Sequence, residues 1–133
     1  MISKLPNVTT SIFSVMSKMA ADHQALNLSQ GFPNFESDPL LIELVNKAMK
    51  DGFNQYAPMP GDIDLRAAIC EKVKLLHSCV YNIDKEITIT AGATQAIFTV
   101  LAALVKKDDE VLIFTPAYDC YEPTIEIFGG KTR

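Results

Sequence analysis

The sequence has no hydrophobic run long enough to cross a membrane as a helix. Its longest near-continuous apolar stretch is Ala96–Val105, ten residues interrupted by Thr99, whereas a spanning helix needs about 20. The segment Met1–Asn7 carries one lysine and no apolar stretch follows it, so we expect no signal peptide. These absences predict a protein without a membrane partner.

Cysteine is scarce, and charge of one sign is nowhere concentrated. Cys70, Cys79 and Cys120 are odd in number and lack C-x-x-C spacing, which argues against a disulfide framework and a zinc site. His23 and His77 have no second ligand at metal-binding spacing, so we expect no metal. Reduced thiols indicate a cytoplasmic protein. The net charge of -4 is spread along the chain, which predicts no nucleic-acid partner.

What is present favours a folded domain, because 48% of the 133 residues are apolar. Arg66 is expected on the polar side of its helix as a solvated charge. Apolar residues at helical spacing predict five helices. The first covers 11–22 and is capped by Thr9, Thr10 or Ser11; the second begins at Pro39, is capped by Asp38 and ends at Gly52. Asp62 or Asp64 begins the third, whose apolar stripe reaches Val80, and the last two cover 96–105, buried on most sides, and 122–128.

Two β-branched or apolar segments, 86–91 and 111–114, read as strands. Strand, helix, strand, helix is typical of a parallel α/β unit. Two strands are too few for a stable parallel sheet, whose faces must both be covered. We therefore expect a third strand at Arg133, where the chain stops, and a longer protein.

The segment Thr90–Ala96 carries the first chemical signal. Small residues make a turn between a strand and an apolar helix, where backbone N–H groups favour an anion such as phosphate. Thr94 adds a hydroxyl donor. An ordinary strand-to-helix turn would have the same composition, so the motif alone leaves both interpretations open.

Three further motifs are weak in isolation. Tyr118, after Pro116-Ala117, follows the second strand at the sheet edge where ligands bind, and could stack on a flat ring or fill the core. Tyr56 lies in a loop that its prolines hold rigid, 53–61. Gly31, in the turn Gln30-Gly31-Phe32-Pro33, permits close approach of a ligand to the backbone.

In this order, "LNLSQGFPNF", "NQYAPMPG", "TAGATQAIF" and "YDCYEP" resemble the class I/II aminotransferases of fold type I, most of all their kynurenine, glutamine and methionine branch. The resemblance implies an α/β fold, in which a helical arm precedes the first parallel strands of the large domain. Residues 1–37 would form the arm and substrate-facing turn, 38–85 a helical segment of the small domain and domain junction, and 86–133 the incomplete large domain.

The resemblance also implies a cofactor, pyridoxal 5′-phosphate. Ala93 and Thr94 would donate to its phosphate, and Tyr118 would stack on its pyridine ring. Tyr56 would reach the phosphate of the neighbouring subunit, so the active site would need a homodimer.

For the substrates, an amino acid and a 2-oxo acid, the resemblance implies two contacts. Gly31 would offer backbone to the substrate carboxylate. Phe13 would touch the substrate side chain, which suggests methionine, glutamine or an aromatic amino acid; a core or arm contact is the alternative for Phe13.

The departures from the family concern catalysis. Its Schiff-base lysine, the acidic partner of the pyridine nitrogen and the carboxylate-binding arginine lie beyond residue 133, so we expect no catalytic residue here and an inactive fragment. The ten lysines fall in amphipathic helices or polar loops. A carbon–sulfur β-lyase of the same fold, a non-catalytic phosphate-binding or dimerisation module, and a generic phosphate-binding α/β domain remain alternatives.

Overall fold

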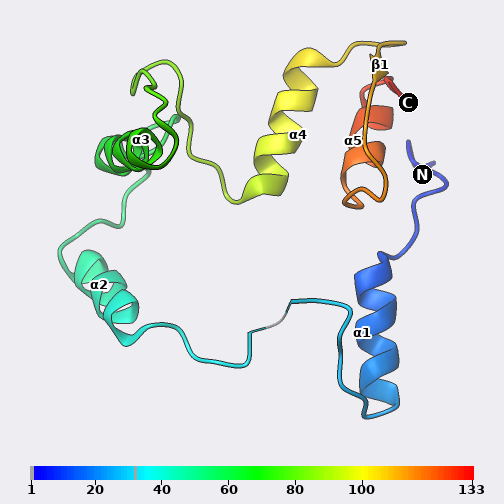
Figure 1. The fold of residues 1–133 in the computed structure, drawn as a ribbon, viewed down its shortest axis with the longest axis horizontal. Coiled ribbons are helices and arrows are strands. Elements are labelled where there is room, and N and C mark those ends of the chain that lie inside the picture. Colours follow the sequence, from blue (N-terminus) through cyan, green and yellow to red (C-terminus); the bar gives the residue numbers. More distant parts are fainter. Residues whose placement is uncertain (1, 32) are drawn as a thin grey trace. The chain divides into compact units, whose positions relative to one another are not determined.

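The structure is a computed structural model that describes residues 2–31 and 33–133. The chain divides into two compact units, and Figure 1 labels their helices and strand β1. We call Met1–Asn34 together with Gly92–Arg133 the sheet unit, and Phe35–Ala91 the helix-pair unit. In chain order the described elements are α1 (Ile12–Asp22), α2 (Pro39–Lys50), α3 (Ile63–His77), α4 (Ala93–Leu104), β1 (Glu110–Val111), α5 (Tyr121–Ile127) and β2 (Lys131–Thr132).

The first three helices begin where the sequence places a capping side chain. The Ser11 hydroxyl accepts from the Ser14 N–H at 3.3 Å. The Asp38 carboxylate accepts from the Leu40 N–H at 2.8 Å, with Pro39 in the first turn. Asp62, rather than Asp64, caps α3. Each cap satisfies N–H groups that the helix itself leaves without a partner, and the three predicted starts are confirmed.

Two helix boundaries differ from the prediction by three residues, and the others by fewer. Helix α4 begins at Ala93, because Gly92, with φ of +89°, has already turned the chain. Helix α3 ends at His77, because Ser78 adopts a left-handed conformation with φ of +56°. Val80 therefore lies outside the helix, although its spacing matches the apolar stripe.

The strand predicted over 86–91 is wrong. This segment forms no strand among the described residues, and the Ile89 N–H donates to the Pro60 carbonyl at 2.9 Å, which belongs to a loop. A strand requires a neighbouring strand to complete its hydrogen bonds, and a local apolar pattern does not identify one.

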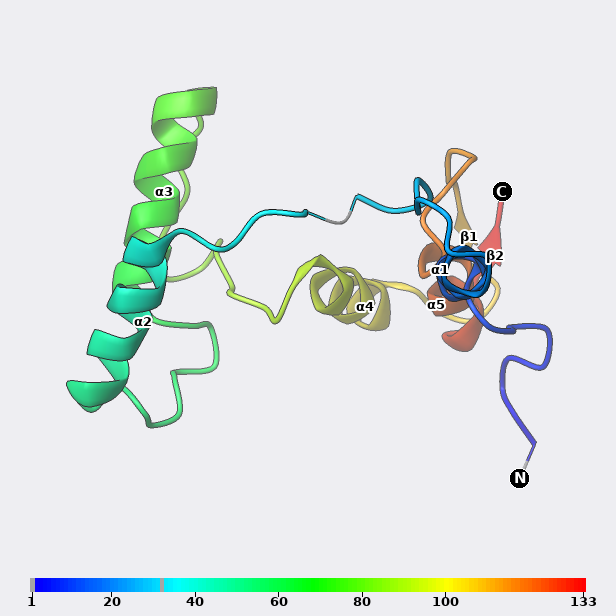
Figure 2. The same ribbon diagram turned by 90° about the horizontal axis from the view of Figure 1, so that it is seen from below.

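The strand predicted over 111–114 is confirmed in part, because β1 covers its first residue. Strand β1 pairs in parallel with β2, with Glu110 opposite Lys131, and the Ile113 N–H extends the pairing to the Arg133 carbonyl at 3.0 Å. Strand β2 thus lies at the end of the chain, where a further strand was expected. Figure 2 shows the two strands beside α5.

A corner just before the strand pair fixes its register. The Asp108 N–H donates to the Gly129 carbonyl at 2.8 Å, and the Lys131 N–H donates to the Asp109 carbonyl at 2.7 Å. The Lys131 ammonium also lies 2.8 Å from the Asp108 carboxylate. These contacts join the loop after α4 to the turn after α5.

The core of the sheet unit lies where α4 packs against α5. The Phe98 and Phe128 rings meet edge to face, with centroids 5.2 Å apart. Ile125 is 1% exposed. A side chain at Gly130 would come within 2.8 Å of Ile125 and 2.7 Å of Val105, so only glycine fits between them.

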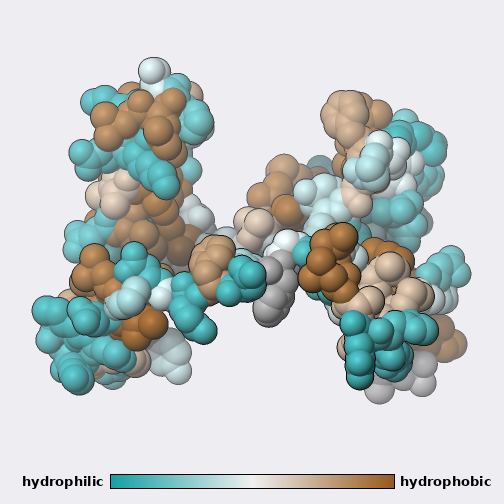
Figure 3. All heavy atoms as spheres, turned by 60° about the horizontal axis from the view of Figure 1, so that its bottom comes forward, coloured by the Kyte–Doolittle hydropathy of each residue, from teal (hydrophilic) through white to brown (hydrophobic). Residues whose placement is uncertain are grey.

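The prediction that α4 is buried on most sides is wrong for this structure. Phe98, Val100 and Leu104 are 47%, 54% and 69% exposed. Among the described residues α5 is the helix that packs on α4, and it covers one side only. Hydrophobic side chains, brown in Figure 3, reach the surface in many places.

The helix-pair unit also overturns an expectation, that Arg66 is a solvated charge. Its side chain is 6% exposed and donates to the backbone carbonyls of Gly61 and Ile83 at 3.2 and 2.7 Å. The apolar stripe of α3 did not reveal this, because both acceptors come from loops outside the helix.

Candidate functional site

The predicted phosphate turn opens helix α4 in the sheet unit. Gly92 is the N-cap, no side chain caps this helix, and Ala93 and Thr94 are exposed. The space beside the Gly92 α-carbon is open, since a side chain there would meet nothing within 4 Å. A twelve-residue helix that begins this way presents its backbone N–H groups and the positive end of its dipole to an incoming anion.

The structure brings two predicted site residues together, Tyr118 and Phe13. Their ring centroids lie 6.0 Å apart with planes tilted by 36°. The Tyr121 ring packs on Tyr118 from another direction, with centroids 6.1 Å apart and an interplanar angle of 63°. Tyr118 is nevertheless 51% exposed. Its ring is therefore held by two aromatic neighbours and still offers surface to a ligand.

The predicted substrate turn at Gly31 is tied to helix α1 by polar side chains. The Ser17 hydroxyl donates to the Gln30 side-chain carbonyl at 3.0 Å and accepts from the Asn27 amide at 3.1 Å. Gly31 is exposed and open, with nothing within 4 Å of where a side chain would start. Phe32, in the same turn, lies outside the described residues.

Sequence reasoning missed Ser17 and Asn27. One signal was available, because Ser17 follows Phe13 by four residues and so shares its face of α1. Helix α1 thus carries the aromatic side chain that meets Tyr118 and the hydroxyl that holds the segment before Gly31. Asn27 also accepts from the Ser29 N–H and hydroxyl, at 3.0 and 2.7 Å.

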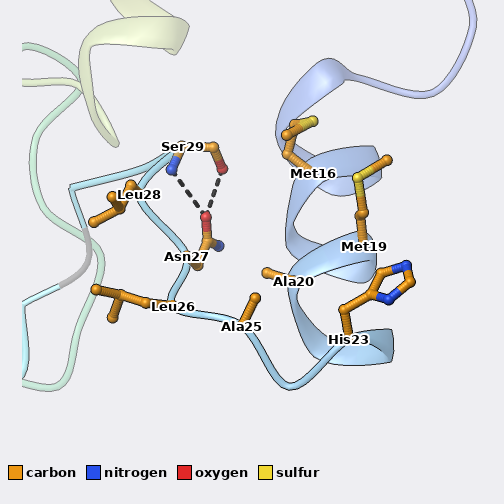
Figure 4. A pocket seen from close by; sticks show the side chains of 9 residues that line it. All are labelled: Met16, Met19, Ala20, His23, Ala25, Leu26, Asn27, Leu28 and Ser29. Atoms are coloured by element: carbon orange, nitrogen blue, oxygen red, sulfur yellow. Dashed lines mark hydrogen bonds between the residues drawn. The ribbon is translucent and has the colours of Figure 1, made fainter.

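A hollow of about 510 Å³ lies beside this network. Its lining comes from Met16, Met19 and Ala20 of α1 and from the segment Leu26–Ser29, and Figure 4 shows the Leu26 and Leu28 side chains pointing away from α1. The dashed lines in Figure 4 are the two hydrogen bonds from Ser29 to Asn27. The lining of this hollow is mostly apolar, and the predicted cofactor and substrate residues do not line it.

Tyr56 belongs to the helix-pair unit and is fully exposed. The loop that carries it is anchored at its start, where the Asn54 side-chain amide donates to the Met49 carbonyl at 2.8 Å. Its end is closed by a turn in which the Gly61 N–H donates to the Pro58 carbonyl at 2.8 Å. The loop therefore presents the phenol outward from a fixed backbone.

The cationic side chains of the described residues are either exposed or bound to neighbouring groups. All ten lysines are exposed. Arg66 is occupied by backbone carbonyls, and Arg133 pairs with Glu110 at 2.6 Å. In residues 2–31 and 33–133, no cluster of three metal-ligating side chains occurs, and every helix is too short or too polar to traverse a bilayer.

Comparison with known proteins gives consistent matches over nearly the whole chain. The family profile for aminotransferase class I and II matches residues 23–133. A methionine aminotransferase of Escherichia coli is 48% identical over 131 residues, which are 98% of this chain and 34% of that protein.

Two solved structures are similar to this chain in both fold and sequence. An Escherichia coli protein identified as having a methionine aminotransferase function superposes with a TM-score of 0.93 at 46% identity, over 99% of this chain and 35% of that one. N-succinyldiaminopimelate aminotransferase from Mycobacterium tuberculosis superposes with a TM-score of 0.91 at 34% identity, over 100% of this chain and 35% of that one. The chain therefore spans about a third of the length of these relatives.

Proposed function

Because the chain belongs to the class I and II aminotransferase family, we propose that it is the N-terminal part of a pyridoxal-phosphate-dependent aminotransferase. The whole enzyme would move an amino group between an amino acid and a 2-oxo acid. Residues 38–85 would contribute to its small domain and 86–133 to the start of its large domain. The observation that supports this proposal most directly is the start of α4, where no side chain caps the helix and Ala93 and Thr94 are exposed, in the same unit as the Tyr118 ring.

The residues present fit a cofactor with a phosphate at one end and a flat ring at the other. The N–H groups of Ala93 and Thr94, with the Thr94 hydroxyl, would hold the phosphate dianion at the helix start, where charge-assisted hydrogen bonds are strong. Tyr118 would stack on the ring, and its packing on Phe13 and Tyr121 would keep the phenol from rotating away. When bound, the cofactor supplies an electron sink for the substrate α-carbon.

Substrate binding would use Phe13 of helix α1 and the turn at Gly31, which Ser17 of the same helix helps to hold. The Gly31 backbone would receive the substrate carboxylate, because an exposed glycine lets the ligand approach the chain closely. Phe13 would touch an apolar or sulfur-bearing side chain while it supports Tyr118. The 48% identity to a methionine aminotransferase supports methionine, with glutamine or an aromatic amino acid as related candidates.

The remaining parts of the active site would come from outside these 133 residues. Tyr56, fully exposed on an anchored loop, would reach the cofactor phosphate of a second subunit in a homodimer. The lysine that holds the cofactor covalently would not be one of the ten exposed lysines described above. We therefore expect no amino transfer by the purified 133-residue chain, and measurable turnover by that chain would contradict this part of the proposal.

A proline substitution tests the phosphate site in the enzyme that contains this chain. Ala93 is the first residue of α4, where proline is tolerated, and the Gly92 ψ of 168° suits a residue before proline. A93P therefore removes one N–H donor and preserves the helix. Loss of a hydrogen bond to a charged group should weaken cofactor binding about 10- to 150-fold.

Thr99→Val, an exposed position on the same helix, is the matched control and should bind the cofactor normally. Unchanged affinity in A93P would show that the Ala93 N–H does not bind the cofactor phosphate. The reaction itself is tested by supplying a cysteine conjugate and a 2-oxo acid together. Amino transfer is expected, whereas release of pyruvate would identify a β-lyase instead.

A further inference from the structure

Arg66 is a buried charged residue in the helix-pair unit that has no role in the proposed function. Its side chain is 6% exposed, and no carboxylate among residues 2–31 and 33–133 forms an ion pair with it. Burying a guanidinium costs free energy unless its donors are satisfied. Here backbone carbonyls accept from two of its nitrogen atoms: Nε donates to Gly61 at 3.2 Å and Nη1 to Ile83 at 2.7 Å.

The two acceptors belong to different segments of the unit. Gly61 ends the loop Phe53–Gly61, which carries Tyr56, and Ile83 lies in the turn that precedes residues 86–91. One side chain therefore joins the end of the Tyr56 loop to a segment distant in sequence.

Two further contacts make the end of the loop rigid. The Ile89 N–H donates to the Pro60 carbonyl at 2.9 Å. Ile89 also packs against Gly61 so closely that a side chain at Gly61 would overlap it, at 2.4 Å from the Ile89 Cγ1 atom. With Asn54 anchoring the start of the loop to α2, both ends of the loop are fixed.

We propose that Arg66 is a positioning residue for Tyr56, whose guanidinium fixes the loop Phe53–Gly61 so that the phenol is presented in one place. The inference rests on the proposed function, in which Tyr56 reaches the cofactor phosphate. Arg66 itself touches neither cofactor nor substrate. Its role needs a planar group with donors pointing in two directions, which lysine lacks.

Hydrogen exchange in the cofactor-free enzyme that contains this chain tests the positioning role directly. In R66K the charge remains but one of the two carbonyls loses its donor, so the amides of residues 53–61 should exchange about tenfold faster or more. Lys72→Gln, an exposed position on the same helix, is the control and should exchange like the wild type. Unchanged exchange in R66K would overturn the inference. If R66K does not fold, R66Q, which keeps a neutral side-chain donor, replaces it.

Affinity for pyridoxal 5′-phosphate then connects the loop to the site. We expect Y56F and R66K each to weaken binding. The double variant should bind no more weakly than R66K alone, because a misplaced Tyr56 no longer contacts the phosphate and its hydroxyl can be removed without further loss. Additive losses, or normal affinity in R66K when Y56F binds weakly, would show that Arg66 stabilises the fold without positioning Tyr56. Normal affinity in Y56F would instead refute the proposed role of Tyr56, and the exchange measurement would still test the loop.

Discussion

Gly61 offers a sharp test of how tightly the end of the Tyr56 loop is packed. It is buried, its φ is +98°, and an alanine Cβ there would lie 2.4 and 2.5 Å from the Cγ1 and Cβ atoms of Ile89. The left-handed backbone costs an L-residue about 1–2 kcal/mol. Overpacking a filled site adds about 1–3 kcal/mol. G61A should therefore lower the free energy of unfolding by about 2–5 kcal/mol.

Gly52 separates the two contributions. Its φ is +94°, almost the same, but a side chain there meets nothing within 4 Å. G52A should therefore show the backbone contribution alone, about 1–2 kcal/mol. The difference between the two variants measures the collision with Ile89.

Urea unfolding followed by far-ultraviolet circular dichroism gives both values, because the helices dominate that signal. Measurement at several protein concentrations separates unfolding from dissociation of any oligomer. Equal losses in G61A and G52A would refute the reasoning, because the Ile89 contact would then be loose enough to relax.

Three other outcomes are expected. Asp62→Ala should cost about 0.5–2 kcal/mol of unfolding free energy, because the Asp64 and Leu65 N–H groups lose their acceptor, and an unchanged urea midpoint would contradict this cap. Ser17→Ala should speed hydrogen exchange in residues 27–31 without affecting 53–61, and equal exchange would mean that the Ser17 bonds do not order the turn. The 133-residue chain should associate in sedimentation as its concentration rises, because its apolar side chains are uncovered; a monodisperse monomer would disprove that.

The helices could be predicted where local chemistry decides them. Ser11, Asp38 and Asp62 accept N–H groups two or three residues further along, so the sequence around each cap contains the whole interaction. The left-handed Ser78 is the exception, since nothing in its side chain requires that conformation.

The strands and the burial of side chains could not be predicted in the same way. Residues 86–91 have strand composition, yet Ile89 bonds to a loop, because pairing is decided by segments distant in sequence. Arg66 looked solvated for a related reason: the carbonyls of Gly61 and Ile83 become its partners only when two loops converge.

In the candidate site, too, single residues could be predicted from the sequence, whereas contacts between distant segments could not. The family resemblance implies separate roles for Phe13 and Tyr118, which lie near opposite ends of the chain, but their ring contact follows only from the fold. Ser17 and Asn27 have no motif to mark them, because their hydrogen bonds join a helix face to a neighbouring extended segment.

The corner that joins the loop after α4 to the turn after α5 limits how homologous chains can differ in length. Asp108 bonds to Gly129 and Asp109 to Lys131 immediately before Glu110 pairs with Lys131. Inserting or deleting one residue between Lys106 and Asp109 would shift β1 by one position against β2. Val111 and Ile113 line one hollow together with Ile125, whereas Leu112 between them is exposed. Because strand side chains alternate between faces, the shift would turn Val111 and Ile113 away from Ile125 and bring Leu112 into their place.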